Sequence, residues 1–467
     1  MDTPRNKIGA TLYLAPISVP ISVEVRDASG YVGHAEKFLT PKTPQEVAAI
    51  LKEASDSGTQ ITVAGSWTGL AGGACPAKGW LLSTENLKNV EIFNGFAHAG
   101  AGVPLVSLQV AAKPTNQFYA PDPTENTASV GGTISTNASG SRSFLYKATR
   151  EHVNSLTVAF LDGTLRTFRR GDKIDFPVEA ISKPNTTKHS VAMPLAPGMD
   201  WVDLFIGAEG TLGVVTDAEL NLLPDVKHLL TGVLFFDTEE AAWNAVDAWR
   251  ATPALRMLEY LDTGSLQLME TQLGGAKAAL IIEQELRSET DEELWVERME
   301  TPGLLEPHSW IASGESDREK FRKFRHGVPE RVNATMQRNG FQKLGSDSAV
   351  PLSRSHEMML FYRELVNREF PGQFAIFGHI GDAHVHVNLL PRTQEQADRG
   401  KEVMTEIARK AVSLNGSVSA EHGLGKRKKH FLPIQYGELD IQTLLAVKRR
   451  FDPAGILGSG TLFPSQS

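Results

Sequence analysis

Three histidines stand close together in the segment GHIGDAHVHVNLL (378–390), namely His379, His384 and His386, in a chain that has 13 histidines. Successive side chains of a strand point to opposite faces, so a strand here would place His384 and His386 on one face. The Gly381–Asp382 turn would let His379 fold back across that face. Imidazoles that converge with a carboxylate can bind a transition metal. The plainer alternative is a strand whose solvated face carries histidines.

A carboxylate and a further imidazole lie in SAEHGLGKRK (419–428), which contains Glu421 and His422. A neutral imidazole titrates near neutral pH and can accept a proton, so His422 is a candidate general base. On strand alternation alone, His384 and His386 would be the pair of metal ligands.

Three glycine-rich segments predict a binding site made of main chain: GSWTGLAGG (65–73), TASVGGTISTNASGSR (127–142) and GAEGTLGVV (207–215). Glycine permits positive φ and close backbone approach, so such segments can direct several N–H groups at a phosphate. The first segment fits neither GxGxxG nor the P-loop, and it has no lysine for a terminal phosphate, which argues against nucleotide hydrolysis. One such loop could be an ordinary turn. Three in one half of the chain indicate an extended dinucleotide.

Hydrophobic periodicity and turn residues predict the elements that position these groups. In the first half they are a turn and amphipathic helix over 41–58 that ends at Gly58, a buried strand over 61–65, and a hairpin over 154–168 that turns at Asp162–Gly163. In the second half they are a charged helix over 317–338 interrupted by Pro329, a hairpin over 374–390, and a long helix over 395–416 capped by Gly416. Composition shifts after Pro224, so we expect one α+β domain up to that residue and a second from 225 to about 416. The pattern does not decide to which of the two domains residues 417–467 belong.

The composition excludes several classes of protein. With 467 residues, 41% hydrophobic and 22% charged, the chain can bury the core of a globular protein of two or three domains. Its net charge of -8, from 47 Lys and Arg against 55 Asp and Glu, gives no global reason to bind nucleic acid. We interpret the dense basic run KRKKH (426–430) as the solvated start of a helix, with a site for an anionic partner as the alternative.

The cysteine content and the hydropathy of the sequence indicate the cellular compartment. Cys75 is the only cysteine, which excludes an intrachain disulfide and a CxxC site and suits a reducing compartment. The N-terminal stretch 1–19 lacks an apolar run of signal-peptide length, and no segment reaches the roughly 20 apolar residues of a membrane span. We therefore expect no integral membrane segment and a cytoplasmic protein, with peripheral attachment to the inner membrane as an alternative.

Taken together, the motifs resemble a known family: the flavoproteins of the vanillyl-alcohol-oxidase fold, in the branch of the D-2-hydroxyacid dehydrogenases. The resemblance extends from about Arg26 to Pro464. GSWTGLAGGACP (65–76) resembles the pyrophosphate loop of the family, APDPTENTASVGGTISTNASGSR (120–142) its second flavin-binding stretch, and FIGAEGTLGVVTDAELNLLP (205–224) the segment beside the adenine half of the flavin. Two positions depart from the family pattern: Lys147, where glycine is usual, and GSGT (458–461), where Asn-Pro-Gly-Lys is common.

The resemblance implies an α+β fold with a two-part FAD-binding domain over 1–224 and a cap domain over 225–416 that has an antiparallel sheet flanked by helices. The C-terminal segment 417–467 would return to the FAD domain and complete the active site. The implied FAD contacts are Gly65, Ser66, Trp67, Thr68, Gly69, Asp122, Ser129, Gly132, Asn137, Ser139, Gly140, Glu209, Gly210 and Val214. Relatives that attach flavin covalently do so through His or Cys in the corresponding loops. Here those loops have no histidine and Cys75 lies at the far end of the first, so FAD should be bound non-covalently.

In the metal-dependent members of the family, the motifs GHxGD…H and EHG bind a divalent metal, assigned as zinc or manganese. By this resemblance the ligands are His379, His386 and Glu421, which differs from the pair that strand alternation favours. His384 stands where asparagine is usual, and we expect it to take part in catalysis by contacting the metal ligands or the substrate. An additional metal ligand is the alternative.

The implied chemistry is oxidation of a D-2-hydroxy acid to the 2-oxo acid. His422 would accept the hydroxyl proton while hydride leaves Cα for flavin N5, with the metal assisting ionisation of the hydroxyl. Arg325 stands where relatives carry an arginine for the substrate carboxylate, and its fork gives bidentate geometry. A solvated helix charge is the alternative for Arg325, and Lys343 is a second candidate for the carboxylate.

Several points stay open at the level of sequence. The small-molecule substrate could be lactate, 2-hydroxyglutarate, glycolate or malate, and the electron acceptor a quinone, a cytochrome or an electron-transfer flavoprotein. A homodimer or an iron-sulfur partner subunit would also be compatible. Other function classes are a metallohydrolase that uses the His/Glu cluster on bound water, a flavin-dependent transferase of the ether-lipid synthase type, and a catalytically silent flavin-binding protein. The transferase typically has consecutive histidines where this chain has Glu421–His422.

Overall fold

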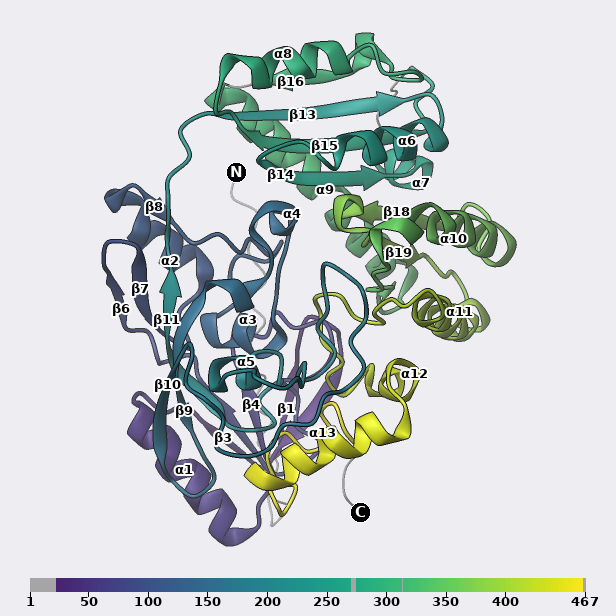
Figure 1. The fold of residues 1–467 in the computed structure, drawn as a ribbon. Coiled ribbons are helices and arrows are strands. Elements are labelled where there is room, and N and C mark those ends of the chain that lie inside the picture. The colour runs from purple at the N-terminus through teal and green to yellow at the C-terminus, as the bar shows by residue number, and fades with distance from the viewer. Residues whose placement is uncertain (1–21, 270–273, 313, 465–467) are drawn as a thin grey trace, which may run out of the picture.

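The computed structural model describes residues 22–269, 274–312 and 314–464 and has a mixed helix and sheet architecture (Figure 1). The N-terminal stretch 1–19 lies outside the described residues. Within the described part of the chain, no helix combines the length and the apolar character that crossing a membrane requires.

A small parallel sheet carries the first glycine loop. It has the order β3 (Lys37–Leu39), β5 (Trp80–Ser83), β4 (Ile61–Ala64), and a short antiparallel pair, β1 (Val23–Arg26) and β2 (Val32–Ala35), precedes it. The predicted helix over 41–58 is confirmed as α1 (Pro44–Ser57), where Thr43 caps the first turn and Gly58, at φ +66°, ends the last. Its apolar face, made of Val47, Ala48, Leu51 and Ala54, is buried in a core that it shares with Ile61 and Leu82 of this sheet and with the antiparallel sheet that follows.

A second, antiparallel sheet follows in the same half of the molecule. Its order is β10 (Leu165–Arg169), β9 (Val153–Ala159), β11 (Val214–Asn221), β7 (Phe96–Gly100), β6 (Val90–Ile92). The predicted hairpin is confirmed as β9–β10, with Asp162 accepting the Thr164 N–H and Gly163 at φ +83°. Helices α2 (Leu105–Ala112), α3 (Val130–Thr136) and α5 (Trp201–Phe205) pack against this sheet, and a short pair, β8 (Gln117–Phe118) and β12 (Leu223–Pro224), lies at its margin.

The second half of the chain forms a larger sheet in which every pairing is antiparallel. Its order is β16 (Trp310–Ala312), β13 (Leu229–Phe236), β15 (Ala278–Glu285), β14 (Leu255–Leu261), β18 (Phe374–Gly378), β19 (His386–Leu389), β17 (Leu344–Gly345). Six helices accompany it: α6 (Glu239–Trp249), α7 (Thr263–Leu268), α8 (Glu289–Arg298), α9 (Glu315–Asn339), α10 (Ser355–Glu369) and α11 (Gln394–Ser413) (Figure 1). The predicted antiparallel sheet flanked by helices is thus confirmed.

Two local predictions are wrong. Helix α9 continues through Pro329, because Val328, Val332 and Met336 bury one face of the helix and this packing outweighs the missing N–H. Helix α11 ends before Gly416, since Asn415 already adopts a left-handed conformation at φ +63° and the Gly416 N–H donates to Ala411.

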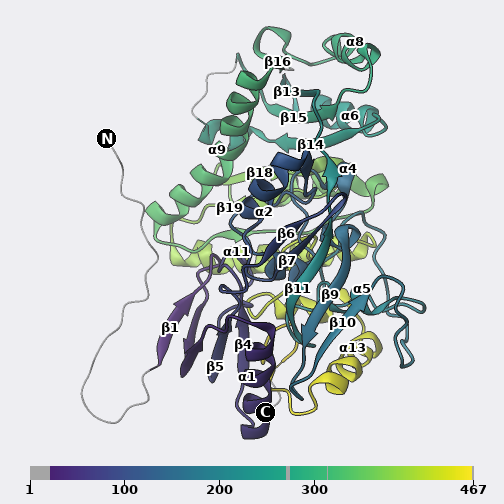
Figure 2. The same ribbon diagram turned by 90° about the vertical axis from the view of Figure 1, so that its left-hand side faces the viewer.

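The C-terminal residues lie against the first half of the molecule. Helix α13 (Glu438–Phe451) lies beside the lower part of the N-terminal half (Figures 1 and 2), and Phe451 stacks on Phe160. Beyond this helix, Ile61 at the edge of β4 donates to Ile456 and accepts from Gly458. The expectation that residues 417–467 pack on the first half of the chain agrees with these contacts. The domain boundaries at 224 and 416 stay predictions.

Candidate active site

The predicted hairpin over 374–390 is confirmed as β18 and β19, joined by a 3-10 turn (Ile380–Asp382). The second strand begins only at His386, and Ala383 has φ +50°. His384 therefore lies in the turn and not in the strand, so the premise of strand alternation does not apply to it. His379 and His386 flank the turn, and Phe377 pairs with His386 across the hairpin.

Glu421 meets both histidines. Its Oε1 atom lies 3.4 Å from Nε2 of His379 and 3.4 Å from Nε2 of His386, and all three side chains are at most 14% exposed. Burial acts to raise the pKa of Glu421, but Lys188 and His379 hold it well below its usual range, so the carboxylate is ionised. Two imidazole nitrogens and one carboxylate oxygen that converge in this way form a donor set suited to zinc or manganese.

The other oxygen of Glu421 is held by the second glycine segment and by a lysine. Oε2 accepts from the Ser139 hydroxyl at 2.7 Å, from the Gly140 N–H at 3.3 Å and from Lys188 Nζ at 3.2 Å. Lys188 is buried and also lies 3.8 Å from Asp382. Sequence reasoning missed Lys188, because a single lysine in TTKHS gives no local signal of burial. These contacts leave Oε1 as the oxygen that faces the histidines.

Asp347 was also missed, and it connects two of the predicted histidines. Its Oδ1 lies 3.1 Å from Nε2 of His384, and its Oδ2 lies 3.4 Å from Nδ1 of His422. Oδ2 also accepts from the His422 main-chain N–H at 2.9 Å and from the Ser419 hydroxyl at 2.6 Å. Burial acts to raise the pKa of Asp347, but its interactions with His422, the Lys428 ammonium and His384 hold that pKa far below its usual range. The carboxylate therefore orients both rings. Its position, 74 residues before Glu421, explains why the sequence did not connect them.

His384 and His422 differ in their surroundings. His384 is completely buried, its Nδ1 has no hydrogen-bond partner within the described ranges, and it belongs to a group with His379, His386 and Glu421 whose ligand atoms lie within 4.8 Å of one another. Burial lowers the pKa of His384 to about 4 and that of His422 to about 3. The His422 ring stacks on His386 at 5.3 Å, and its Nε2 lies 3.9 Å from Glu421. Both rings are neutral at physiological pH.

Arg325, on α9, is not a solvated helix charge. Its Nε and Nη2 donate to Glu259 of β14 at 2.8 and 2.9 Å, and the side chain is 11% exposed. Burial acts to lower the pKa of Arg325, and the carboxylates of Glu259 and Asp122 outweigh it and raise that pKa. The guanidinium thus lies at the site, and two of its three nitrogens, Nε and Nη2, already bind Glu259.

The three glycine segments lie close together in the structure, as expected if they form a single binding site. Gly65 lies against Ser129, so that a Cβ on Gly65 would come within 2.3 Å of the Ser129 hydroxyl oxygen. Asp122 and Gly140 form a β-bridge, and the Glu209 N–H donates to Ser135. Ser66, Trp67, Thr68 and Gly69 follow Gly65 in the loop after β4. Gly132 lies on α3 and Asn137 at its end, while Gly210 precedes β11 and Val214 begins it.

The first of these loops has the features of a phosphate site. Across the parts of the chain that the structure describes, no hydrogen bond is donated by the N–H groups of residues 65–70. Trp67 adopts φ +64°, and a Cβ on Gly69 would have no neighbour closer than 3.8 Å. A row of unpaired N–H groups along an open loop fits the pyrophosphate of FAD.

Not every predicted flavin contact has a free side chain. The Ser129 hydroxyl caps α3, and the Glu209 carboxylate accepts from the main-chain N–H groups of Leu424 and Gly425 at 2.8 and 2.7 Å. Burial raises the pKa of Glu209 to about 7. Both side chains are therefore already engaged, and at Glu209 the main-chain N–H is engaged as well, by the Ser135 carbonyl. Lys147, which departs from the family pattern, has φ +69° and ψ −154°, a region that glycine adopts without strain and that costs another residue about 1–3 kcal/mol.

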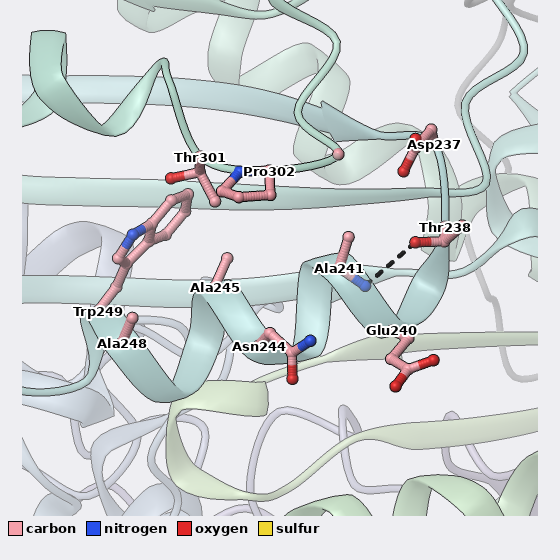
Figure 3. Close-up of a pocket in the computed structure, with 11 residues that line it drawn as sticks. Asp237, Thr238, Glu240, Ala241, Asn244, Ala245, Ala248, Trp249, Thr301 and Pro302 are labelled. Atoms are coloured by element: carbon pink, nitrogen blue, oxygen red, sulfur yellow. Dashed lines mark hydrogen bonds between the residues drawn. The ribbon is translucent and has the colours of Figure 1, made fainter.

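The interpretation of KRKKH as a solvated helix start is wrong. Lys426 is buried and donates to Gly73 and Thr461, and Arg427 donates to the carbonyls of Ser29 and Lys343. The run, which follows Glu421 in the chain, is thereby joined to the first glycine loop at Gly73, and to Ser29, Lys343 and the Thr461 hydroxyl. A surface hollow on the large sheet, between α6 and residues 301–303, lies apart from the histidines and contains none of the predicted site residues (Figure 3).

Comparison with known proteins agrees with this geometry. Residues 35–169 match the family described as an FAD binding domain, and residues 226–462 match the C-terminal domain of the FAD linked oxidases. The chain belongs to the FAD-linked oxidases. This FAD-linked oxidase is therefore an oxidoreductase with an FAD-binding domain, and the metallohydrolase alternative has no support from its family.

Relatives of this FAD-linked oxidase are similar over nearly their whole length. A D-lactate dehydrogenase of Archaeoglobus fulgidus is 30% identical, with 91% of each chain covered. The glycolate oxidase subunit GlcD of Bacillus subtilis is 28% identical, covering 93% of this chain and 90% of the relative. A D-2-hydroxyglutarate dehydrogenase of Xanthomonas citri pv. viticola is 28% identical, covering 91% and 88%.

A solved alkyldihydroxyacetonephosphate synthase has the same fold, with a TM-score of 0.66 over 90% of this chain and 75% of that one. Its 15% sequence identity makes this a likeness of fold alone. The predicted vanillyl-alcohol-oxidase type of architecture is confirmed by these matches.

Proposed function

We propose that this FAD-linked oxidase is a metal-assisted dehydrogenase of a D-2-hydroxy acid. The observation that supports it best is the position of Glu421, whose Oε2 is held by Ser139 and Gly140 of a glycine segment while Oε1 faces His379 and His386. One carboxylate thus joins the proposed flavin loop to the proposed metal ligands. The similarity to dehydrogenases named for D-lactate and D-2-hydroxyglutarate points to the same class of substrate.

His379, His386 and Glu421 would hold the metal. His384 is proposed as a fourth ligand through Nδ1, because this atom is buried without a partner among the described residues and Asp347 keeps Nε2 occupied. When bound, FAD supplies a hydride acceptor and the divalent metal supplies a positive charge that favours ionisation of a hydroxyl.

His422 is proposed as the base. Its Nδ1 faces Asp347, so Nε2 is the nitrogen left to accept the hydroxyl proton of the substrate. Because burial lowers the pKa of His422 to about 3, the ring is neutral and the lone pair of Nε2 is available across the physiological range. Asp347 stabilises the imidazolium that results, since it is ionised and hydrogen-bonded to the same residue.

Cations for the substrate carboxylate come from the second half of the chain. Arg325 retains Nη1 beyond the two nitrogens that bind Glu259, and Lys343 is the second candidate. Burial and the neighbouring Lys428 ammonium lower the pKa of Lys343 to about 8, so it carries its charge at neutral pH. We propose that both contribute. The class of electron acceptor stays a prediction: a quinone, a cytochrome or an electron-transfer flavoprotein.

The test is an anaerobic absorbance spectrum of the purified protein during titration with the D and L forms of lactate, malate and 2-hydroxyglutarate, and with glycolate. Bleaching of the flavin bands by one D acid, lost after treatment with a chelator and restored by zinc or manganese, is the expected result. Flavin that no acid bleaches would contradict the dehydrogenase and favour a reaction without net oxidation, such as that of the ether-lipid synthase type. Bleaching that survives complete metal removal would contradict the role of the metal.

A further inference from the structure

A buried carboxylate on the central strands of the large sheet faces two residues of the proposed site. Glu259 lies on β14, and the antiparallel register that pairs Tyr260 with Gly378 brings Glu259 opposite His379, the residue after β18. Its side chain is 7% exposed. A carboxylate in such a place must be neutralised or hydrogen-bonded, because desolvation disfavours its charge.

Both oxygens of Glu259 are in use. Oε2 accepts from Nε of Arg325 at 2.8 Å, and Oε1 accepts from Nη2 of the same residue at 2.9 Å. Oε1 also lies 3.0 Å from Nδ1 of His379, although the ring is not turned so that this nitrogen points along a hydrogen bond. The opposite ring nitrogen, Nε2, faces Glu421. The two ring nitrogens of His379 thus face two different carboxylates, Glu259 and Glu421.

We infer that Glu259 is a positioning residue that fixes two functional groups with one carboxylate: the metal-ligand face of His379 and the guanidinium of Arg325. This inference rests on the proposed function. A histidine whose second nitrogen donates to a carboxylate is held in one tautomer and becomes a stronger ligand. The same carboxylate orients the fork of Arg325, so its remaining N–H groups are aimed for a substrate carboxylate.

A purely structural role for Glu259 predicts a different pattern. If its only task were to neutralise Arg325 in the core, its removal would affect stability and substrate binding but would leave the affinity for metal unchanged. The affinity for metal in the absence of substrate therefore separates the two roles, because Arg325 is not among the proposed ligands.

The chain offers a matched control. Glu283, on the neighbouring strand β15, is also buried and also binds arginines, with Oε1 at 3.1 Å from Arg142 and 3.2 Å from Arg256. It has no contact with His379 or Arg325 in the described structure. Glu283→Gln thus makes the same chemical change in the same sheet away from the proposed ligands.

The experiment measures the dissociation constant of zinc, and separately of manganese, for the FAD-loaded protein by competition with a chromophoric chelator. Wild type, Glu259→Gln, Glu283→Gln and His379→Ala are compared without substrate, and steady-state kinetics follow at saturating metal. We expect Glu259→Gln to weaken metal binding by about 10–100-fold, the usual effect of losing a partner of a ligand histidine. Its KM for the acid should rise more than its kcat falls, and Glu283→Gln should retain the wild-type affinity for metal.

Unchanged metal affinity in Glu259→Gln, with loss in His379→Ala, would overturn the inference and leave the proposed function standing. Wild-type protein that binds neither metal would overturn both. If Glu259→Gln fails to fold, judged by circular dichroism and flavin content, Glu259→Asp takes its place, because it keeps the buried charge for Arg325 but shortens the reach. Wild-type metal affinity in a folded Glu259→Asp variant would likewise overturn the inference.

Discussion

Replacing Asp347 by asparagine tests how the proposed base is held. Oδ2 of Asp347 accepts from the His422 main-chain N–H and the Ser419 hydroxyl and faces Nδ1 of His422, while Oδ1 faces His384. Because several donors meet at the position of Oδ2, the amide oxygen should take that position and the NH₂ group should face His384. His422 then keeps an acceptor but loses the charge that stabilises its protonated form.

The magnitude follows from the loss of the negative charge opposite the protonated ring, since a hydrogen bond to a charged group is worth about 1.5–3 kcal/mol. Since about 1.4 kcal/mol corresponds to a factor of ten in rate, flavin reduction should slow by roughly 10- to 150-fold. A second consequence concerns His384. Facing an NH₂ group, its Nε2 must become an acceptor, so its proton moves to Nδ1 and this atom can no longer bind a metal. Asp347→Asn should therefore also weaken metal binding if His384 is a ligand.

The assay is the rate of flavin bleaching after anaerobic rapid mixing with the acid identified by titration, at saturating metal. Ser419→Ala is the matched control, because it removes another donor to Oδ2 and leaves the charge of Asp347 in place. We expect its rate to stay within a few-fold of wild type, in line with a net value of about 1 kcal/mol for an ordinary hydrogen bond. A wild-type rate in Asp347→Asn would refute the reasoning, since His422 would then not depend on this carboxylate.

Further predictions concern substrate binding, the cofactor and stability. The KM for the acid should rise as pH increases through about 8, because Lys343 loses its charge there, and Lys343→Arg should remove this dependence since arginine stays protonated; a KM that is flat with pH in the wild type would argue against Lys343 as a contact. Gly65→Ala should reduce the ratio of flavin to protein after gel filtration, because the new Cβ displaces the Ser129 hydroxyl, a helix cap worth about 1 kcal/mol; full flavin content would contradict the close packing of these loops. Lys188→Met should lower the free energy of unfolding by about 3–5 kcal/mol, since it leaves two buried carboxylates without their cation. Lys52→Met, which breaks only an exposed ion pair, should cost about 0.5 kcal/mol or less in the same urea titration, and equal losses in the two variants would contradict the burial argument.

The sequence by itself determined the local elements and predicted that the three glycine segments belong to one site. Helix α1, the β9–β10 hairpin and the β18–β19 hairpin depend on short-range periodicity and on turn residues such as Gly58 and Gly163, so they could be read directly. The glycine segments could be recognised because a site made of main-chain N–H groups requires glycine, and glycine content can be read from composition. The pairing of His379 and His386 with Glu421 came from the resemblance to a family and not from spacing.

Only the tertiary structure decided which charges share a site. Lys188, Glu259 and Asp347 come from separate parts of the chain, and each is buried beside a predicted residue by strand register or loop packing that no local pattern encodes. Tertiary contacts also explain the burial in KRKKH. A run of charges is normally solvated, but here three main-chain carbonyls and the Thr461 hydroxyl, all distant in the chain, accept from Lys426 and Arg427. Periodicity records which side of an element is apolar, whereas a polar site depends on contacts between elements far apart in the chain, and these exist only once the chain has folded.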